Sequence, residues 1–192
     1  MENHAISGIL LAGGYSSRMG RDKAELAFRG QSMLQYQADK LRALGLAELI
    51  VAGYDKPLPN ARVVPDIYPH RGPLSGLHAG LSGIQSRCAL VLAVDTPLVP
   101  ESLLRALMKL HTRGATITLA DGRPEPLIGV YDKSLAQACE RVLQGEDTSM
   151  RRFLKTVSMT TLEYQGDRAL LMNCNTPEDF ERIEALWTAD IF

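Results

Sequence analysis

Segments with the pattern of buried strands alternate along the whole chain with segments that have the pattern of helices. Residues 6–12 form a near-continuous apolar run closed by two glycines, which predicts a strand covered on both faces. Residues 32–44 carry apolar side chains at helical spacing, and residues 89–94 form a second, wholly apolar strand. This alternation predicts a three-layer α/β fold, with a Rossmann-like, mainly parallel sheet and helices on both faces.

The remaining elements continue the same alternation. We expect further strands at residues 49–53, 62–64, 116–119, 127–131, 162–164 and 170–172, with a turn at 121–124. We expect further helices at residues 76–85, 100–111 and 133–143, and a last one that begins at Thr176-Pro177, where threonine suits the N-cap and proline the first helical position. No linker or repeat divides the 192 residues, so we expect one domain over residues 1–192.

Charge and cysteine content exclude several classes of protein. The chain has 21 lysines and arginines against 22 aspartates and glutamates, so no overall field would attract nucleic acid or an anionic membrane. The early apolar run is too short to span a membrane and lacks the flanks of a signal peptide. Three widely spaced cysteines and four histidines form no disulfide framework or metal motif. We therefore expect a cytoplasmic protein whose phosphate recognition, if any, is local.

A glycine-rich segment directly follows the first strand. Residues 11–23 contain Gly13, Gly14 and Gly20 and bring two cations, Arg18 and Lys23. Glycines let backbone N–H groups approach phosphate oxygens, and the cations add positive charge where a triphosphate is most negative. The segment matches neither the Walker A pattern nor the dinucleotide-binding fingerprint. We interpret it as a triphosphate site; the alternative is a turn with solvated charges.

Asp95 ends the second apolar strand, and ligands of such sheets bind beyond the carboxyl ends of strands. A carboxylate facing the cations of the first segment could hold Mg²⁺ against phosphate oxygens, because Mg²⁺ usually takes one or two protein carboxylates. The alternative is an aspartate that only caps the following helix.

Three further groups of residues are candidates for binding. Gly76 and Gly80, near the start of a predicted helix, suit close approach to a base or ribose, or else tight packing of the helix on the sheet. Asn173 and Asn175 present amides on one side of an extended chain, or else form a turn. Glu125 brings a carboxylate to a strand entrance, although its two flanking prolines could make it only a rigid turn.

Five sequence blocks, taken together, resemble one family. They are the segment 11–23, Gly72-Pro73-Leu74-Ser75-Gly76 with Gly80-Leu81, Asp95-Thr96-Pro97, Glu125-Pro126-Leu127, and the segment 173–179. In this order they resemble the molybdenum cofactor guanylyltransferases, within the wider group of nucleotidyltransferases. The blocks touch most of the chain, so the resemblance is far more specific than one glycine-rich loop.

The resemblance implies a reaction and a set of site residues. It implies transfer of GMP from GTP to the terminal phosphate of molybdopterin, with Mg²⁺ on Asp95 and catalytic roles for Arg18, Lys23 and Asp95. It places Glu125, Asn173 and Asn175 near the acceptor and allows molybdoenzyme apoproteins or other cofactor-synthesis proteins as partners. The implied nucleotide-binding residues are Leu11, Ala12, Gly13, Gly14, Lys23, Asp66, Gly76, Gly80 and Asp95.

One departure from the family and two alternatives stay open. Family members often carry an asparagine at the end of the second strand, where this chain has Ala52-Gly53, so one nucleotide contact is in doubt. Gly13-Gly14 favours guanine, because cytidylyltransferases and sugar-phosphate nucleotidyltransferases more often place alanine first. Such a relative is the first alternative, and a non-catalytic nucleotide-binding or cofactor-binding module is the second.

Overall fold

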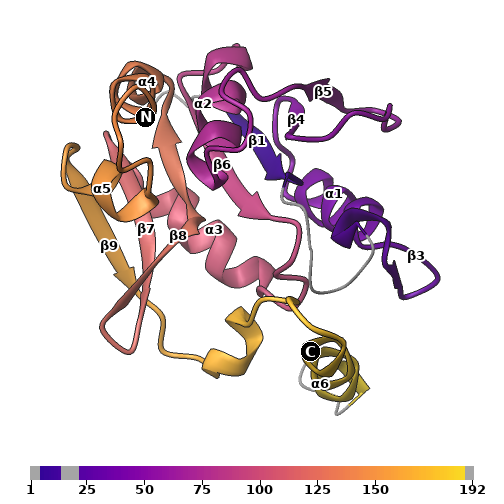
Figure 1. The fold of residues 1–192 in the computed structure, drawn as a ribbon. Coiled ribbons are helices and arrows are strands. Elements are labelled where there is room, and N and C mark those ends of the chain that lie inside the picture. The colour runs from indigo at the N-terminus through magenta and orange to yellow at the C-terminus, as the bar shows by residue number, and fades with distance from the viewer. Residues whose placement is uncertain (1–4, 14–21, 189–192) are drawn as a thin grey trace.

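A seven-stranded sheet forms the centre of the molecule in the computed structural model, which describes residues 5–13 and 22–188 (Figure 1). The strand order is β5-β4-β1-β6-β8-β7-β9. Six strands run in one direction, and β8 is antiparallel to both of its neighbours. The strands are β1 (Ile6–Leu11), β4 (Leu49–Ala52), β5 (Arg62–Val64), β6 (Cys88–Ala93), β7 (Ala115–Ala120), β8 (Arg123–Asp132) and β9 (Met159–Glu163). The predicted mainly parallel sheet is confirmed.

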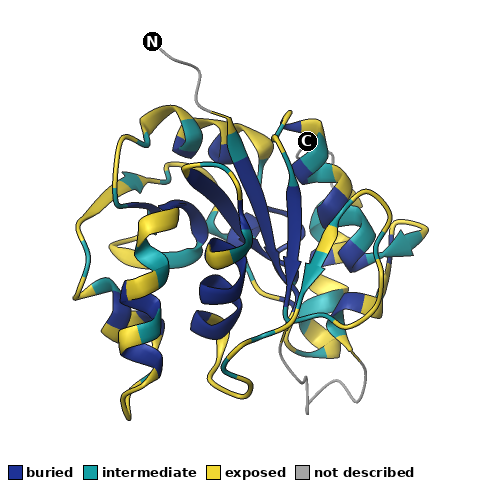
Figure 2. Ribbon diagram, turned by 90° about the horizontal axis from the view of Figure 1, so that it is seen from above, coloured by how far each residue is buried: buried dark blue, intermediate teal, exposed yellow. Residues whose placement is uncertain are grey.

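Helices cover both faces of this sheet, and each face has its own hydrophobic core. The first core joins the sheet to α1 (Met33–Ala43), α3 (Glu101–Leu110) and α6 (Pro177–Thr188). The second joins it to α2 (Pro73–Gly83), α4 (Ala136–Leu143) and α5 (Met150–Leu154). In β1, Leu10 faces the first core while Ile9 and Leu11 face the second, as expected for a strand with alternating side chains. Figure 2 shows the central strands buried between the two helical layers, which confirms the three-layer prediction.

Short elements connect these layers. A small hairpin of β2 (Ala27–Phe28) and β3 (Gln31–Ser32) precedes α1 and turns through Arg29 and Gly30, both of which have positive φ. Three single 3₁₀ turns complete the chain: η1 (Lys23–Glu25), η2 (Lys133–Leu135) and η3 (Arg168–Leu171). Ser32 caps α1, because its hydroxyl accepts a hydrogen bond from the Gln35 N–H at 3.1 Å.

The predicted strand at residues 170–172 is wrong. These residues belong largely to η3, which Asp167 caps by accepting a hydrogen bond from the Ala169 N–H at 2.9 Å. A short apolar run does not distinguish a strand from a buried helical turn, and here Leu170 and Leu171 are buried as a turn. The predicted helix at 76–85 starts earlier, at Pro73, and the turn at 121–124 is shorter, because Arg123 already pairs with Ala120. The helix α5 was not predicted, because its five residues are too few to show a helical period.

Within the described residues, no helix is both long and apolar enough to cross a lipid bilayer.

Candidate active site

Three segments meet where β1, β4 and β6 end. Beyond β1, the Ala12 N–H donates to the Ala52 carbonyl at 2.9 Å, and beyond β6 the Val94 N–H donates to the Leu11 carbonyl at 2.9 Å. The residues that follow each strand are therefore side by side at the carboxyl edge of the sheet, where ligands of such folds bind. The Ala12 N–H is bonded to the sheet and is not available to a ligand, whereas Gly13 is exposed.

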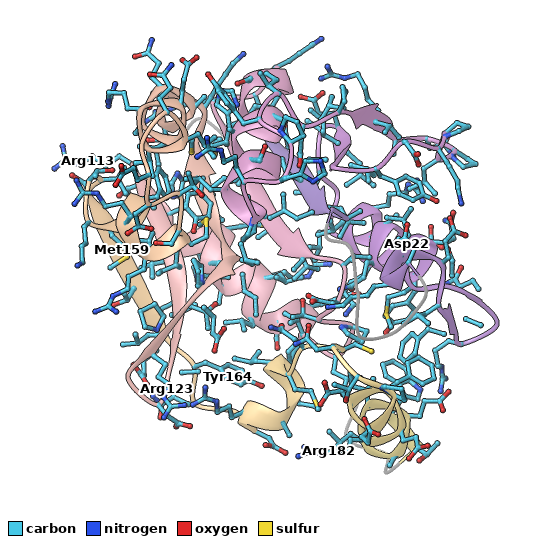
Figure 3. The ribbon with its side chains drawn as sticks, viewed as in Figure 1. Asp22, Arg113, Arg123, Met159, Tyr164 and Arg182 are labelled. Carbon is cyan, nitrogen blue, oxygen red and sulfur yellow. The ribbon has the colours of Figure 1, made fainter. Side chains whose placement is uncertain are left out.

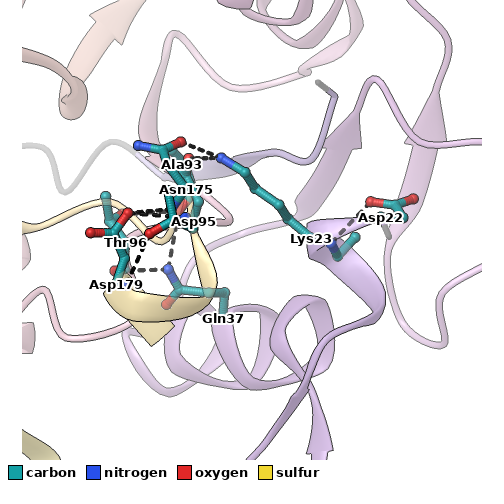
Figure 4. A network of polar contacts seen from close by, with 10 residues as sticks. Asp22, Lys23, Gln37, Ala93, Asp95, Thr96, Asn175 and Asp179 are labelled. Atoms are coloured by element: carbon teal, nitrogen blue, oxygen red, sulfur yellow. Dashed lines mark hydrogen bonds and ion pairs between the residues drawn. The ribbon is translucent and has the colours of Figure 1, made fainter. Parts of the chain in front are cut away.

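Lys23 brings its ammonium to Asp95 at this edge (Figure 4). The Lys23 Nζ donates to the Asp95 Oδ2 at 2.9 Å and to the Asn175 Oδ1 at 2.5 Å. The side chains of Lys23 and Asp95 are 15% and 19% exposed, so both are largely shielded but still open to a ligand. Asp22 anchors the turn that starts at Lys23 by accepting a hydrogen bond from the Ala24 N–H at 3.0 Å. The structure thus brings together three predicted site residues from three distant parts of the chain.

The segment that carries Asn175 is held against Asp95 by its backbone. The Cys174 N–H donates to the Asp95 carbonyl at 2.7 Å. Asp179 then accepts hydrogen bonds from the N–H groups of Asn175 and Thr176, each at 3.0 Å, while the Thr176 hydroxyl accepts one from the Asp179 N–H. This reciprocal capping starts α6 at the predicted Thr176-Pro177 position. Burial raises the pKa of the Cys174 thiol to about 11, so it stays protonated near neutral pH.

Asp66 follows β5 and places an unpaired oxygen among glycines. Its Oδ1 is buried and has no hydrogen-bond partner among residues 5–13 and 22–188. A Cβ atom added to Gly53 or Gly76 would lie 3.5 or 3.7 Å from this oxygen. Burial raises the pKa of the Asp66 carboxyl. A buried acceptor without a partner is costly, so this oxygen is suited to a donor group supplied by a ligand.

Gly53 approaches Gly13 more closely than any other residue type would allow. It has φ of +75°, and a Cβ there would lie 2.7 Å from the Gly13 Cα. At the position where the resemblance leads one to expect an asparagine, the chain therefore has backbone packed against the glycine-rich segment. Gly53 has no side chain that could make the contact expected of the family's asparagine.

Gly80 does not lie at the ligand edge. A Cβ there would lie 2.7 Å from the Ile9 Cγ2, inside the second hydrophobic core. Tight packing of the helix on the sheet explains this glycine, and the structure does not place Gly80 at the predicted nucleotide site. Gly76 is also buried in α2, but it lies beside both Leu11 and Asp66.

Glu125 lies beyond the carboxyl end of β6. The strands β6 and β8 are antiparallel, so the residues of β8 that precede Ile128, the partner of Leu92, extend past that end. Arg168 reaches this carboxylate with its Nη2 at 3.7 Å, and burial raises the pKa of the Glu125 carboxyl. Arg123 and Tyr164 mark the same end of the molecule (Figure 3). Glu125 is thus a strand residue at the correct edge rather than part of a turn, while Asn173 is exposed. Gly14 and Arg18 lie outside the described residues.

The residues at this edge fit a divalent ion that is held mainly by a substrate. Among residues 5–13 and 22–188 no three His, Cys, Asp or Glu side chains come together as a metal cage. Asp95 alone offers a partly exposed carboxylate beside the lysine. Mg²⁺ is commonly bound in this way, by one or two carboxylates together with substrate phosphates and water.

Two side chains that were not predicted as site residues contact the segment around Asp95. Gln37 and Lys40 lie on α1 and donate hydrogen bonds to backbone carbonyls on either side of Asp95. The signal in the sequence was weak: both are polar residues close to the apolar face of a predicted amphipathic helix, where a hydrophobic residue is the common choice.

Comparison with known proteins relates the whole chain to one group. The sequence model of the family described as "MobA-like NTP transferase domain" matches residues 8–169. A probable molybdenum cofactor guanylyltransferase from Opitutus terrae is 34% identical, over 93% of this chain and 94% of its own. A second from Carboxydothermus hydrogenoformans is 30% identical, over 95% and 96%.

Solved structures share the fold. The molybdopterin-guanine dinucleotide biosynthesis protein A from Archaeoglobus fulgidus superposes with a TM-score of 0.80 at 22% identity, over 95% of this chain and 99% of that one. A nucleotidyl transferase from Methanothermobacter superposes with a TM-score of 0.74 at 20% identity, over 97% and 98%.

Proposed function

The chain belongs to the family of MobA-like NTP transferase domains, and we propose that it transfers GMP from GTP to the terminal phosphate of molybdopterin. The observation that carries this proposal is the contact of Lys23 with Asp95 and Asn175 at the ligand edge of the sheet. This contact brings the cation at the end of the glycine-rich segment beside a carboxylate and an amide. The cation can bind a triphosphate, and the carboxylate can hold the Mg²⁺ that accompanies it.

The proposed reaction needs no covalent intermediate. An oxygen of the acceptor's terminal phosphate attacks the α-phosphorus of GTP, the bond from that phosphorus to the bridging oxygen breaks, and pyrophosphate leaves. The attacking oxygen is already anionic, so no side chain has to remove a proton. Transfer of this kind depends on positioning and on neutralising charge. Lys23 supplies a positive charge, and Asn175 orients its ammonium through the 2.5 Å hydrogen bond.

We propose Asp95 as the protein ligand of Mg²⁺, with the phosphate oxygens of the nucleotide completing the site. When bound, the ion supplies positive charge that stabilises the triphosphate and the leaving pyrophosphate. Asp95 is suited to this because its backbone is held by β6 and by the Cys174 N–H, while its carboxylate stays partly exposed.

Asp66 supports the choice of guanine. An ionised carboxylate only accepts hydrogen bonds, and its buried Oδ1 has no partner within the described protein. Guanine presents two adjacent donors, N1–H and the N2 amino group, on one edge. We propose that Asp66 accepts from the bound nucleotide, beside the close backbones of Gly13 and Gly53.

Incubation of the protein with molybdopterin, Mg²⁺ and each nucleoside triphosphate in turn tests the proposal. We expect pyrophosphate release with GTP and a product whose mass equals that of molybdopterin plus GMP. Preference for CTP or UTP would assign the chain to the cytidylyltransferases or sugar-phosphate nucleotidyltransferases. GTP binding without any product would indicate a non-catalytic nucleotide-binding module and would overturn the proposed reaction.

We also propose that the protein works in the cytoplasm and passes its product to molybdoenzyme apoproteins or other cofactor-synthesis proteins. The location is supported by the three buried cysteines, all of which are free thiols. The receiving partners are inferred from the chemistry of the proposed product alone.

A further inference from the structure

The segment that carries Asp95 is buried but has little regular structure of its own. After β6 ends at Ala93, the backbone runs irregularly to Pro100, and the residues from Thr96 to Val99 are buried. Backbone carbonyls buried outside helices and sheets need hydrogen-bond partners from elsewhere. Within the segment, the Thr96 and Val99 N–H groups reach the Ala93 and Thr96 carbonyls only at 3.4 Å.

Gln37 donates two hydrogen bonds to this segment, which add to the bond from the Thr96 hydroxyl to the Ala93 carbonyl at 3.0 Å. Its side chain is fully buried, and its Nε2 donates to the Ala93 carbonyl at 3.1 Å and to the Thr96 carbonyl at 3.0 Å. These two carbonyls stand on either side of Asp95, so one amide group ties together the chain just before and just after it (Figure 4).

Lys40 continues the same contact one helical turn later. Its Nζ donates to the Pro97 carbonyl at 2.5 Å and to the Val99 carbonyl at 3.1 Å. Residues three apart lie on the same side of a helix, so Gln37 and Lys40 form one polar edge of α1 against the segment. Burial lowers the pKa of the Lys40 amine to about 7. Burying an amine here therefore lowers the stability of the fold, whereas an apolar side chain would have no such cost.

We propose that Gln37 and Lys40 are positioning residues that fix the Asp95 carboxylate for metal-dependent nucleotide binding and transfer. The inference rests on the proposed function for the transfer step. Four carbonyls between Ala93 and Val99 accept hydrogen bonds from these two side chains. Without them, these four carbonyls lose two side chains that hold them. The described contacts that remain in the segment are then those of Asp95 with Lys23 and the Cys174 N–H, the Val94 N–H bond to Leu11, and the bonds from Thr96 to the Ala93 carbonyl and from the Val99 N–H to the Thr96 carbonyl.

Lys40→Met and Gln37→Met test the proposal, because methionine keeps a long unbranched side chain and removes the donors. Lys109→Met is the matched control, since Lys109 is exposed on α3. GTP binding by the full chain is measured by calorimetry without acceptor, first in metal-free buffer and then with saturating Mg²⁺. Hydrogen exchange of the peptide that spans residues 94–99 is measured on the same proteins.

We expect both variants to bind GTP without metal as the wild type does, but to gain less affinity from Mg²⁺ and to exchange faster over residues 94–99. With Mg²⁺ present, the kcat should fall by on the order of a hundredfold and the KM for GTP should rise with the lost affinity, while the KM for molybdopterin should change little. Lys40→Arg, which keeps donors and charge, should recover part of the kcat. The proposal is overturned if Mg²⁺ strengthens GTP binding equally in wild type and variants, or if metal-free binding is lost as well, which would indicate general damage.

These readouts separate this inference from the proposed function. If the wild type makes no product with GTP and molybdopterin, the proposed reaction fails. The difference between metal-free and Mg²⁺-supported GTP binding still decides whether Gln37 and Lys40 position Asp95.

Discussion

The Lys23 ammonium lies 2.9 Å from the Asp95 carboxylate, although 72 positions separate the two residues in the chain. Parallel pairing of β1 with β6 explains the contact, because it aligns Leu11 with Ala93 and so brings the segments beyond both strands to one edge. The contact therefore forms only when the centre of the sheet has formed. Because the cost of desolvating both charges offsets much of their attraction, a largely shielded ion pair is weak evidence for a role in stability, which favours a role in binding.

Replacing either partner of this pair should stop the reaction without unfolding the protein. For Lys23→Ala and Asp95→Ala we expect turnover with GTP to fall on the order of a hundredfold or more, because each removes a preorganised charge at the triphosphate. Pyrophosphate release measures the turnover, and thermal unfolding should stay close to that of the wild type. Lys109→Ala serves as the control, and near-normal turnover in both site variants would contradict the assignment.

Asp66→Asn should make the free protein more stable and the nucleotide complex weaker. The variant removes the charge of a buried oxygen that has no partner in the described part of the chain, so the free energy of unfolding at pH 7 should rise by on the order of 1 kcal/mol. Affinity for GTP should fall by about tenfold or more, because a hydrogen bond to a charged acceptor is lost. Denaturant unfolding and calorimetry measure the two effects, and unchanged GTP affinity would exclude a nucleotide contact.

The stability gain of Asp66→Asn should depend on pH. Burial raises the pKa of the folded Asp66 above its ordinary value of 3.8, so the carboxyl favours folding most when it is protonated at low pH. That contribution is lost as the pH rises through the raised pKa. The difference in unfolding free energy between variant and wild type should therefore be full at neutral pH and shrink toward pH 4. A difference that grows on acidification would contradict this account.

Gly53→Ala should be far more damaging than Gly30→Ala, although both glycines have positive φ. A Cβ at Gly30 meets no described atom within 4 Å, so we expect Gly30→Ala to carry only the backbone penalty of about 1 kcal/mol. A Cβ at Gly53 would strike the Gly13 backbone, which adds about 1–3 kcal/mol and displaces the glycine-rich segment. Urea unfolding measures both costs. GTP affinity should fall for Gly53→Ala alone; equal affinity in the two variants would argue against this.

The fluorescence of Trp187, the single tryptophan, should report how α6 docks on the hairpin. Phe28 is 1% exposed, and its ring centroid lies 6.4 Å from that of Trp187 and 6.3 Å from that of Phe180. Phe28→Ala should lower the free energy of unfolding by about 3–5 kcal/mol and move the folded-state emission of Trp187 to longer wavelength. Phe153→Ala, in the core on the opposite face, should cost similar stability without the emission shift. An equal shift in both variants would contradict specific docking.

Most strands of the central sheet, most helices and the principal charges of the site could be predicted from local pattern, whereas the short strands β2 and β3 could not. The apolar run that became β1, the cap at Ser32 and the start of α6 at Thr176-Pro177 each depend on residues close together in the chain. Lys23 and Asp95 could be predicted as two halves of one site, because the ends of parallel strands meet at one edge.

Tertiary structure alone decided features that depend on distant partners. The periodicity of a strand does not give its direction, so it did not reveal that β8 is antiparallel to its neighbours. An apolar run as short as Leu170 to Met172 fits the pattern of a strand and that of a helical turn equally well. A glycine in the sequence does not reveal whether it faces a ligand or, like Gly80, a side chain of the core. The roles of Gln37 and Lys40 were hidden for the same reason: an amphipathic pattern separates polar from apolar faces, but only packing shows which polar side chain meets a buried carbonyl.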